Sequence, residues 1–331
     1  MNIRDIAKLA CVSTATVSRA INNPEAVQES TRVRINQILE ETGYTLPPRK
    51  RNAEGGVLLF LFNDSDYLFY DRISAGFLMA LRDTKYSIMM CPLPDDGTIR
   101  KKMIQSLGKQ KIAGVIYALR DYYASDIEVF SGKGVPVVLA RKYNGLGLEF
   151  PRCYVDFSVG SFRMTDYLLS TGCRKIYLMV EKASFQFVES FCSGWKRAFF
   201  ERDIPFDEQW IIHTQNSVQG GFNKGLELLS SSTIPDAFFC SSNEMALGIL
   251  RAARDLSIPV PEKLSVVGFT DSPTADYPEP ELTTLHHPIE QLGTAIASML
   301  LNYIRNSSEP SNSYPEIVLQ PKLCIRQSSR S

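Results

Sequence analysis

The sequence lacks the residues and segments that mark metal enzymes, disulfide-linked secreted domains and membrane proteins. Only three of its 331 residues are histidine, and its seven cysteines are scattered and never spaced as Cys-x-x-Cys, which argues against a zinc site and a disulfide framework. No apolar run approaches the roughly 18 residues of a membrane-spanning helix. The first ten residues carry Arg4, Asp5 and Lys8 and no apolar stretch, so they do not resemble a signal peptide. We expect a cytoplasmic protein that binds no metal.

Catalytic signatures are missing as well. No Gly-x-Ser-x-Gly elbow, Walker loop or Gly-x-Gly-x-x-Gly fingerprint follows a strand-like run of the sequence. His286 and His287 are adjacent, in a segment that we expect to cross between two lobes, and no cluster of His, Asp and Glu has metal-ligand spacing. We therefore predict that the chain is not an enzyme, has no catalytic residues and needs no cofactor.

The positive charge of the chain is concentrated near its N-terminus. The whole sequence balances 36 Lys and Arg against 36 Asp and Glu. Residues 1–52, however, hold eight bases against five acids, a net charge of +3, which leaves 28 bases against 31 acids, or −3, for the rest. This asymmetry favours a nucleic-acid surface at the N-terminus and none elsewhere.

Residues 1–45 are predicted to form a small all-α domain of three short helices. Apolar residues at helical spacing predict the first helix over 3–10. The tripeptide after it breaks this pattern, and Ser13 is a favourable N-cap for a second helix over 14–22. Ser30 is expected to cap the third helix. Helix, tight turn, helix and supporting helix together make a helix-turn-helix DNA-binding domain.

The second helix of a helix-turn-helix enters the major groove of DNA. With Val17 filling the centre of the domain, four side chains are left on the outer face of this helix, and Arg19 among them can make a bidentate contact to guanine. Hydroxyl and amide side chains nearby suit phosphate oxygens. The predicted major-groove residues are Thr14, Ala15, Ser18 and Arg19, and the predicted phosphate contacts are Ser13, Thr16, Asn22 and Thr31.

From residue 57 onward, apolar strand-like runs alternate with amphipathic helical stretches. Near-continuous apolar strands of this kind belong to parallel sheets that helices cover on both faces. Two such runs in series predict an α/β core of two doubly wound parallel-sheet lobes, the first at about 57–170 plus 288–315 and the second at about 171–285 plus 316–331. Ligands of open parallel sheets lie beyond the carboxyl ends of the strands. We therefore expect a binding cleft between the lobes.

Several stretches resemble the lactose/galactose repressor family of bacterial transcription regulators. The family's N-terminal domain is matched in residues and spacing by IRDIAKLACVSTATVSRAINNP and VQESTRVRINQILEETGY. Landmarks of its core appear in GVPVVLARK, VDFSVGSFRMTDYLL, SSNEMALGIL and LSVVGFTDSPTADYPEPELTTLHHPIEQLG. The resemblance covers most of the chain. It implies a homodimer on a two-fold-related DNA operator, with a core similar to that of periplasmic sugar-binding proteins.

Residues 46–56, LPPRKRNAEGG, form a linker that departs from the family. The resemblance implies a hinge helix whose leucine enters the minor groove, but Ala53 stands in the place of that leucine and Lys50 in that of a preceding alanine. Two prolines and two glycines disfavour a helix. Arg49, Lys50 and Arg51 instead make a basic arm that can enter a narrow minor groove. A solvated linker with incidental charge is the alternative.

The predicted effector cleft departs from the family's sugar-binding pattern. Arg141 and Thr270 stand where the resemblance implies aspartates, and Phe191 where it implies an arginine. An arginine at the cleft suits an anion, so we predict an effector with a carboxylate or phosphate and an apolar portion, such as a sugar acid or phosphorylated sugar. Alternatively, Arg141 forms an internal ion pair, with Asp64 or Asp271 as neutralising neighbours, and Phe191 is ordinary core. The predicted effector-binding residues are Asp64, Tyr67, Phe69, Tyr70, Arg141, Phe191, Asn243, Thr270 and Asp271.

The sequence thus predicts a DNA-binding transcription regulator, a repressor that responds to a small molecule. Within that class, control by a protein co-repressor or a vestigial ligand cleft is the alternative mechanism. An exported solute-binding protein would share the two-lobed core, but would need a signal peptide and no helix-turn-helix. An enzyme on a doubly wound fold would need a catalytic constellation that the sequence does not contain.

Overall fold

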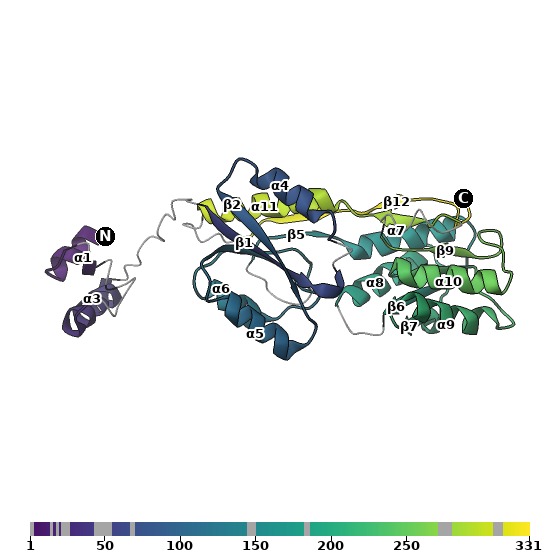
Figure 1. Cartoon of the computed structure of the whole chain (residues 1–331), viewed down its shortest axis with the longest axis horizontal. Coiled ribbons are helices and arrows are strands. Elements are labelled where there is room, and N and C mark those ends of the chain that lie inside the picture. Colours follow the sequence, from purple (N-terminus) through teal and green to yellow (C-terminus); the bar gives the residue numbers. More distant parts are fainter. Residues whose placement is uncertain are drawn as a thin grey trace. The chain divides into compact units, whose positions relative to one another are not determined.

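The computed structural model describes residues 3–13, 16–17, 20, 27–42, 55–66, 70–143, 150–181, 186–270, 280–306 and 314–331. The chain divides into two compact units: Met1–Asn52, with which Arg305–Pro310 is grouped, and Ala53–Ile304 with Ser311–Ser331. We describe each unit by itself (Figure 1). Within the described ranges, no helix is both long and apolar enough to cross a lipid bilayer.

The N-terminal unit contains helices α1 (Ile3–Leu9) and α3 (Glu29–Thr42). Its core confirms the predicted central position of Val17, which is fully buried together with Ile6 and Ile35. Other buried or half-buried members of this core are Ala7, Ala10, Ala20, Val12, Val27, Ile38 and Leu39.

Two details of the helix termini in this unit can be compared with the sequence. The Ser13 hydroxyl accepts a hydrogen bond from the backbone N–H of Thr16 at 3.1 Å, as predicted for an N-cap. The predicted cap at Ser30 is wrong: α3 begins at Glu29, and the Gln28 carbonyl accepts bonds from the N–H groups of Thr31 and Arg32. Ser30 therefore lies inside the first turn, where its hydroxyl is not needed as a cap.

The first lobe of the large unit is a six-stranded parallel sheet in the order β11-β5-β4-β3-β1-β2. Alternate residues of its central strand point to opposite faces: Phe60 joins the cluster under α4 and α11, and Leu61 joins the one under α5 and α6. The elements are β1 (Gly56–Asn63), η2 (Asp64–Asp66), α4 (Ile73–Leu81), β2 (Tyr86–Leu93), α5 (Gly97–Leu107), β3 (Ile112–Ala118), α6 (Ala124–Ser131), β4 (Val137–Leu139), β5 (Arg152–Val155), α11 (Ile289–Asn306) and β11 (Glu316–Leu319).

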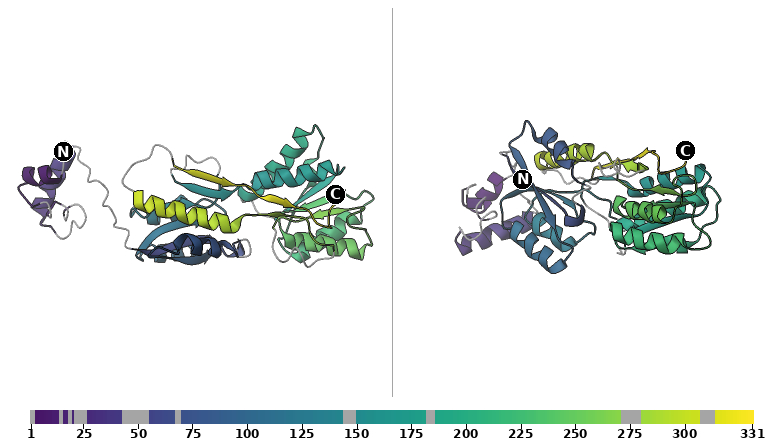
Figure 2. Two further views of the ribbon diagram at one scale, coloured as in Figure 1. Left: turned by 90° about the horizontal axis from the view of Figure 1, so that it is seen from above. Right: turned by 45° about the vertical axis from the view of Figure 1, so that its right-hand side comes forward.

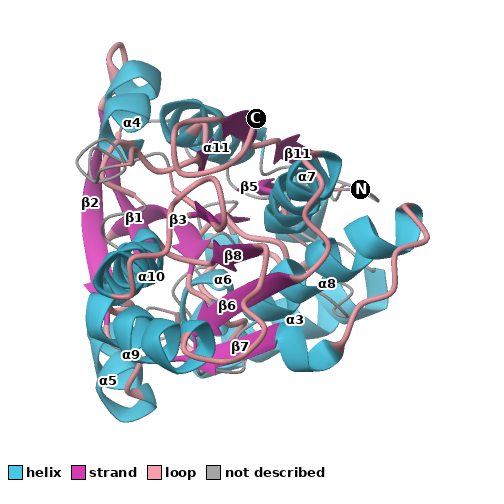
Figure 3. Cartoon of the chain, turned by 90° about the vertical axis from the view of Figure 1, so that its right-hand side faces the viewer, coloured by secondary structure: helices cyan, strands magenta, loops and turns pink. Residues whose placement is uncertain are grey.

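The second lobe is a four-stranded parallel sheet in the order β7-β6-β8-β9. Helices α7 and α8 cover one face around the buried Trp195, and α9 and α10 cover the other (Figure 3). The elements are α7 (Phe157–Ser170), β6 (Ile176–Glu181), α8 (Gln186–Glu201), η3 (Glu208–Trp210), β7 (Ile211–Thr214), α9 (Val218–Leu229), β8 (Ala237–Cys240), α10 (Asn243–Asp255) and β9 (Ser265–Val267).

Glycines bring α9 and α10 unusually close together. A Cβ on Gly221 would lie 2.2 Å from the carbonyl oxygen of Met245, and one on Gly248 would lie 2.3 Å from that of Val218. These distances are shorter than any van der Waals contact, so neither position can carry a side chain.

The chain crosses between the lobes at three places. It leaves the first lobe after β5, returns through β10 (Thr284–His286) to α11, and leaves again through β12 (Lys322–Cys324), which pairs antiparallel with β10. The segment with His286 and His287, which we expect to cross between the lobes, is one of these crossings. Figure 2 shows α11, from late in the sequence, lying within the first lobe.

The lobe boundaries differ from the sequence prediction in two places. Helix α7, which we had assigned to the first lobe, packs with α8 in the core of the second. Strand β11, which we had assigned to the second lobe, pairs with β5 and extends the sheet of the first. Both differences have one cause: the first crossing precedes α7, and the last follows β11.

Candidate functional site

The part of the predicted DNA surface that the structure describes consists of three hydroxyl side chains. Ser13 is exposed, and Thr16 and Thr31 are half-buried. The Ser13 hydroxyl lies 2.8 Å from that of Thr16, so the two form a small polar cluster at the start of the second predicted helix. The other predicted DNA contacts, Thr14, Ala15, Ser18, Arg19, Asn22, Arg49, Lys50 and Arg51, lie outside the described residues.

A network of four charged side chains occupies the carboxyl ends of the strands in the large unit. Asp66 ends the η2 turn that follows β1, Arg120 follows β3, Arg141 follows β4, and Glu181 is the last residue of β6. All four are buried, with 7–8 % of their surface exposed. Asp66, Arg120 and Arg141 lie close together because the parallel strands that they follow end on one edge of the first lobe's sheet. Glu181 meets them from the sheet of the second lobe.

Asp66 is the common partner of the two arginines. Its Oδ1 accepts hydrogen bonds from Nε and Nη2 of Arg120 at 2.9 and 2.7 Å, and its Oδ2 accepts one from Nη2 of Arg141. Arg141 also donates from Nε to the carbonyl of Ala118 at 2.8 Å. The internal ion pair that we considered for Arg141 therefore exists, but its partner is Asp66.

Arg120 connects the two lobes. Its Nη1 donates to Oε1 of Glu181, in the second lobe, at 2.8 Å. The guanidinium carbon lies over the ring of Phe187 on α8, 5.4 Å from its centre, which is a cation–π distance. Burial would lower the pKa of Arg120, but Asp66 and Glu181 more than compensate and raise it above its ordinary value. The guanidinium is therefore charged and bound from both sides of the cleft.

Aromatic rings line the remaining walls of the cleft. The guanidinium carbon of Arg141 lies 5.9 Å from the ring centres of both Tyr70 and Phe157. Burial raises the pKa of the Tyr70 hydroxyl, so Tyr70 is neutral. The cleft retains a cavity of about 30 Å³, the room of roughly one water molecule. Its walls include Tyr70, Arg120, Ala140, Arg141, Lys142, Val155, Asp156, Phe157, Phe187, Ser190 and Leu292.

The other predicted effector residues lie in different surroundings. Phe191 is fully buried with its ring centre 4.4 Å from that of Phe269, which is a core position. Asp64 is exposed, and its carboxylate accepts a bond from the N–H of Ser65 at 2.7 Å. Tyr67, Phe69 and Asp271 lie outside the described residues.

Asn243 positions the backbone that follows β9. Its Oδ1 accepts from the N–H groups of Phe269 and Thr270, both at 3.2 Å, and its Nδ2 donates to the Thr270 carbonyl at 2.6 Å. Asn243 is buried and Thr270 half-buried. Both residues thus hold the edge of the cleft together by contacts within the second lobe.

Sequence reasoning missed Asp66, Arg120 and Glu181 as individual site residues. A usable signal was present, because each lies within three residues of the carboxyl end of a strand. The pairing itself had no signal, since it depends on how the lobes meet.

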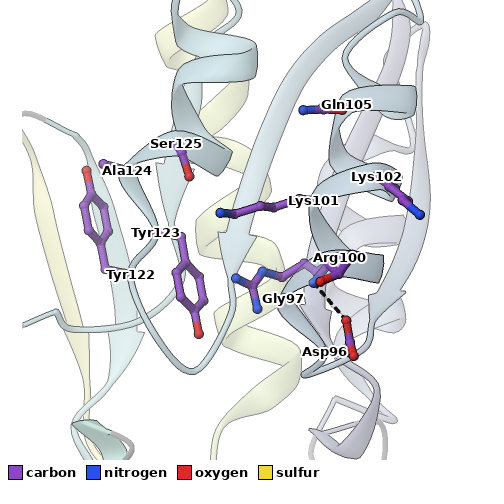
Figure 4. Close-up of a pocket in the computed structure, with 11 residues that line it drawn as sticks. Asp96, Gly97, Arg100, Lys101, Lys102, Gln105, Tyr122, Tyr123, Ala124 and Ser125 are labelled. Carbon is purple, nitrogen blue, oxygen red and sulfur yellow. Dashed lines mark hydrogen bonds between the residues drawn. The ribbon is translucent and has the colours of Figure 1, made fainter.

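A second and larger hollow, of about 890 Å³, lies beside the N-terminal ends of α5 and α6 in the first lobe (Figure 4). Arg100 borders it, but its Nε donates to the buried carboxylate of Asp126 at 3.0 Å and its guanidinium lies 3.6 Å from the ring centre of Tyr123. The charge of Arg100 is thus compensated within the fold. Lys101 and Lys102 at the rim are exposed.

Comparison with known proteins matches the N-terminal unit and part of the large unit to described families. Residues 2–46 match the lacI family of bacterial regulatory proteins, and residues 165–329 match a periplasmic binding protein-like domain. The ribose operon repressor of Haemophilus influenzae is 27 % identical over 330 residues, 98 % of both chains. The transcriptional repressor CytR of Escherichia coli K12 is 27 % identical over 332 residues, 99 % of this chain and 96 % of its own.

Solved structures match the same architecture. A complex of the transcriptional regulator CelR with cellobiose has a TM-score of 0.74 and 26 % identity, and covers 99 % of both chains. A lac repressor dimer bound to operator and the anti-inducer ONPF has a TM-score of 0.70 at 22 % identity, and covers 100 % of this chain and 99 % of its own. The second likeness concerns the fold.

Proposed function

We propose that this chain, which belongs to the lacI family of bacterial regulatory proteins, represses transcription from an operator and changes its DNA affinity when a small molecule binds between the two lobes. The observation that carries this proposal is that both units match: a lacI-family DNA-binding domain precedes a periplasmic binding protein-like core. The relatives are transcriptional regulators rather than enzymes. The cytoplasm remains the proposed location, since that is where a bacterial operator lies.

The proposed DNA surface comprises the residues predicted from the sequence. Burial of Val17 and Ala20 supports it, because these residues turn one side of the second predicted helix toward the core. Arg19 is proposed to read a base, with Thr14, Ala15 and Ser18 beside it. Ser13, Thr16, Asn22 and Thr31 are proposed phosphate contacts, and Arg49, Lys50 and Arg51 a basic arm.

Selection of binding sites from random duplex DNA tests this function directly. The full chain should enrich a sequence with two-fold symmetry, because a dimer binds two half-sites with two identical DNA-binding domains. Binding to that sequence should exceed binding to scrambled DNA by 10³-fold or more, the order typical of specific regulators. A chain that enriches no sequence would not be a sequence-specific regulator.

The proposed effector is a small molecule with an acidic group, such as a sugar acid or phosphorylated sugar. Among the described residues of the first lobe, Arg120 and Arg141 share the carboxylate of Asp66, and Lys142 lies 3.9 Å from Asp156. Two guanidinium groups around one carboxylate favour binding of a further anion. Calorimetric titration with sugar acids, sugar phosphates and neutral sugars tests the class.

A vestigial cleft, with control by a protein co-repressor, is the second candidate mechanism. The observation that favours it is the small space left in the cleft, about 30 Å³, against the roughly 300 Å³ or more of ordinary ligand pockets. If none of the compounds binds while operator binding is intact, this mechanism replaces the first.

A further inference from the structure

The contact between Arg120 and Glu181 has a consequence for how the core is regulated. We infer that Glu181 acts as a built-in ligand of the cleft: its carboxylate occupies the anion site of the first lobe and holds the two lobes together when no effector is bound. This inference rests on the proposed function, because it names the regulation of the same cleft.

The anion site is fixed in the first lobe, independently of Glu181. The backbone N–H of Arg120 donates to Oδ1 of Asn63 at 2.6 Å, and Nδ2 of Asn63 donates in turn to Asp95 at 2.5 Å. The Nε edge of the guanidinium is bound by Asp66 at 2.7–2.9 Å. The Nη1 group is directed to the second lobe, where Glu181 accepts its hydrogen bond. Arg120 therefore stays with the first lobe, and Glu181 is the partner that can leave.

Among the described residues, the carboxylates paired with the two arginines come from both lobes. Asp66 of the first lobe is shared by Arg120 and Arg141, and Glu181 of the second lobe adds the second negative charge. A buried charge without a partner is strongly unfavourable. Closure without a ligand therefore depends on Glu181, and removal of its charge should favour the open arrangement, in which Arg120 is solvated.

An acidic effector would bind Arg120 in the same way as Glu181 does. A carboxylate or phosphate can accept the Nη1–H bond that Glu181 now accepts at 2.8 Å. The cavity beside Arg120 and Arg141 has room for about one water molecule, so such a compound does not fit there, and we expect it to displace Glu181 when it binds the Nη1 group of Arg120. Effector and Glu181 are thus competitors for one guanidinium, and effector binding has to separate or rearrange the lobes.

The distance between the lobes in the ligand-free chain provides the first test. Spin labels at exposed Gln105 on α5 and exposed Asn223 on α9, in a background without other reactive cysteines, report this distance by pulsed electron paramagnetic resonance. Figure 1 shows α5 and α9 on the side away from α11 and β12, where opening moves the lobes furthest. Glu181→Gln should increase the fraction of molecules in which the two spin labels are further apart than in the wild type.

The matched control is Glu201→Gln. Glu201 pairs with Arg197 at 2.7 Å within α8, at the surface and inside one lobe. The same chemical change there should leave the distance distribution of the wild type unchanged.

Binding of inorganic phosphate, used as a simple anionic probe, provides the second test. Glu181→Gln should bind the probe about tenfold more tightly than the wild type, the ratio expected when one competing charge-assisted hydrogen bond is weakened. Arg120→Met should open the lobes as well but bind no phosphate at the cleft. The two variants should thus change phosphate affinity in opposite directions: Glu181→Gln removes the competitor and strengthens binding, whereas Arg120→Met removes the site. A misfolded chain would not bind phosphate more tightly.

Two results would overturn the inference. One is a Glu181→Gln chain with the wild-type distance distribution; the other is an open Glu181→Gln chain whose phosphate affinity is no higher than that of the wild type. Neither result affects the proposed function, which is decided by operator binding. Conversely, a chain that binds no operator could still show the lobe opening.

Discussion

Arginine has opposite tasks in the two units of the chain. In the large unit, Arg120 and Arg141 are buried and their donors are bound by carboxylates and a carbonyl. They fix the geometry of a cleft. In the N-terminal unit, Arg19 is proposed to donate two parallel hydrogen bonds to the edge of a guanine base. The same side chain therefore gives rigidity in one place and sequence reading in the other.

Replacement of Arg19 by Ala should relax specificity at one position of the operator. Loss of a bidentate contact to guanine costs roughly 1–3 kcal/mol, whereas binding to scrambled DNA should hardly change. Titrations on operator and scrambled duplexes measure both. Equal losses on the two DNAs would show that Arg19 contributes charge and reads no base.

Replacement of Asn243 by Ala should destabilise the large unit. The change removes the oxygen that accepts two backbone N–H bonds and the nitrogen that donates to a carbonyl. A buried polar group left without a hydrogen bond costs about 1–3 kcal/mol. Urea unfolding should show a loss of roughly 2–4 kcal/mol, since these groups regain part of their bonds by relaxation. Asn223→Ala, at an exposed position on α9, is the control and should be nearly neutral; similar losses for both would refute the role of Asn243.

At the scale of elements, the alternation of strands and helices could be predicted from the sequence because buried parallel strands are apolar throughout. Strand β1 shows this clearly, since six of its eight residues are buried. The lobe assignment of β11 could not be predicted, because this short edge strand is largely exposed and its pattern does not indicate which sheet it joins. The cleft shows the same limit: Arg141 was found by its position, but its partner Asp66 depends on the turn after β1.

The turn between α1 and the second predicted helix offers a test at this scale. Cys11 has φ of +49°, a conformation that costs a non-glycine residue roughly 1–2 kcal/mol. Cys11→Gly should therefore stabilise the N-terminal unit by about 1 kcal/mol and slow amide hydrogen exchange in α1 and α3 of the full chain. Ser257→Gly, at φ of +53° in the second lobe, should leave exchange in these two helices unchanged. Faster exchange after Cys11→Gly would mean that the added freedom of the unfolded chain outweighs the relief of strain.

The basic linker should contribute to DNA affinity through its charge alone. Replacement of Arg49, Lys50 and Arg51 by Gln should weaken binding to operator and scrambled DNA by similar factors. It should also reduce the slope of log affinity against log salt by up to about 3, since each lost phosphate contact removes roughly 0.9. Titrations at several salt concentrations measure this slope. An unchanged slope would support the alternative of a solvated linker without DNA contact.

At the scale of the whole molecule, binding to an operator with two-fold symmetry requires two copies of the chain, and these need a surface through which they pair. Helix α4, which covers the sheet of the first lobe near its edge strand β2, carries two neighbouring exposed apolar side chains, Leu78 and Met79, at 69 and 70 % exposure. Single exposed apolar side chains are ordinary on a protein surface, but neighbouring ones are typical of protein–protein contacts. We therefore expect the proposed homodimer to bury this surface of α4.

Charges at this surface should therefore separate the dimer and weaken operator binding together. Leu78→Glu with Met79→Glu would place two carboxylates in an apolar contact, at a cost of roughly 2 kcal/mol or more, which is about thirtyfold in the dimer Kd. Sedimentation should show monomer at concentrations where the wild type is dimeric, and operator affinity should fall because each half-site is then bound alone. Phe200→Glu, at a 79 % exposed apolar residue of the second lobe, is the control for added charge. If the α4 variant remains a dimer, the interface lies elsewhere; if it is monomeric but binds the operator as the wild type does, dimerisation is not what couples the core to DNA.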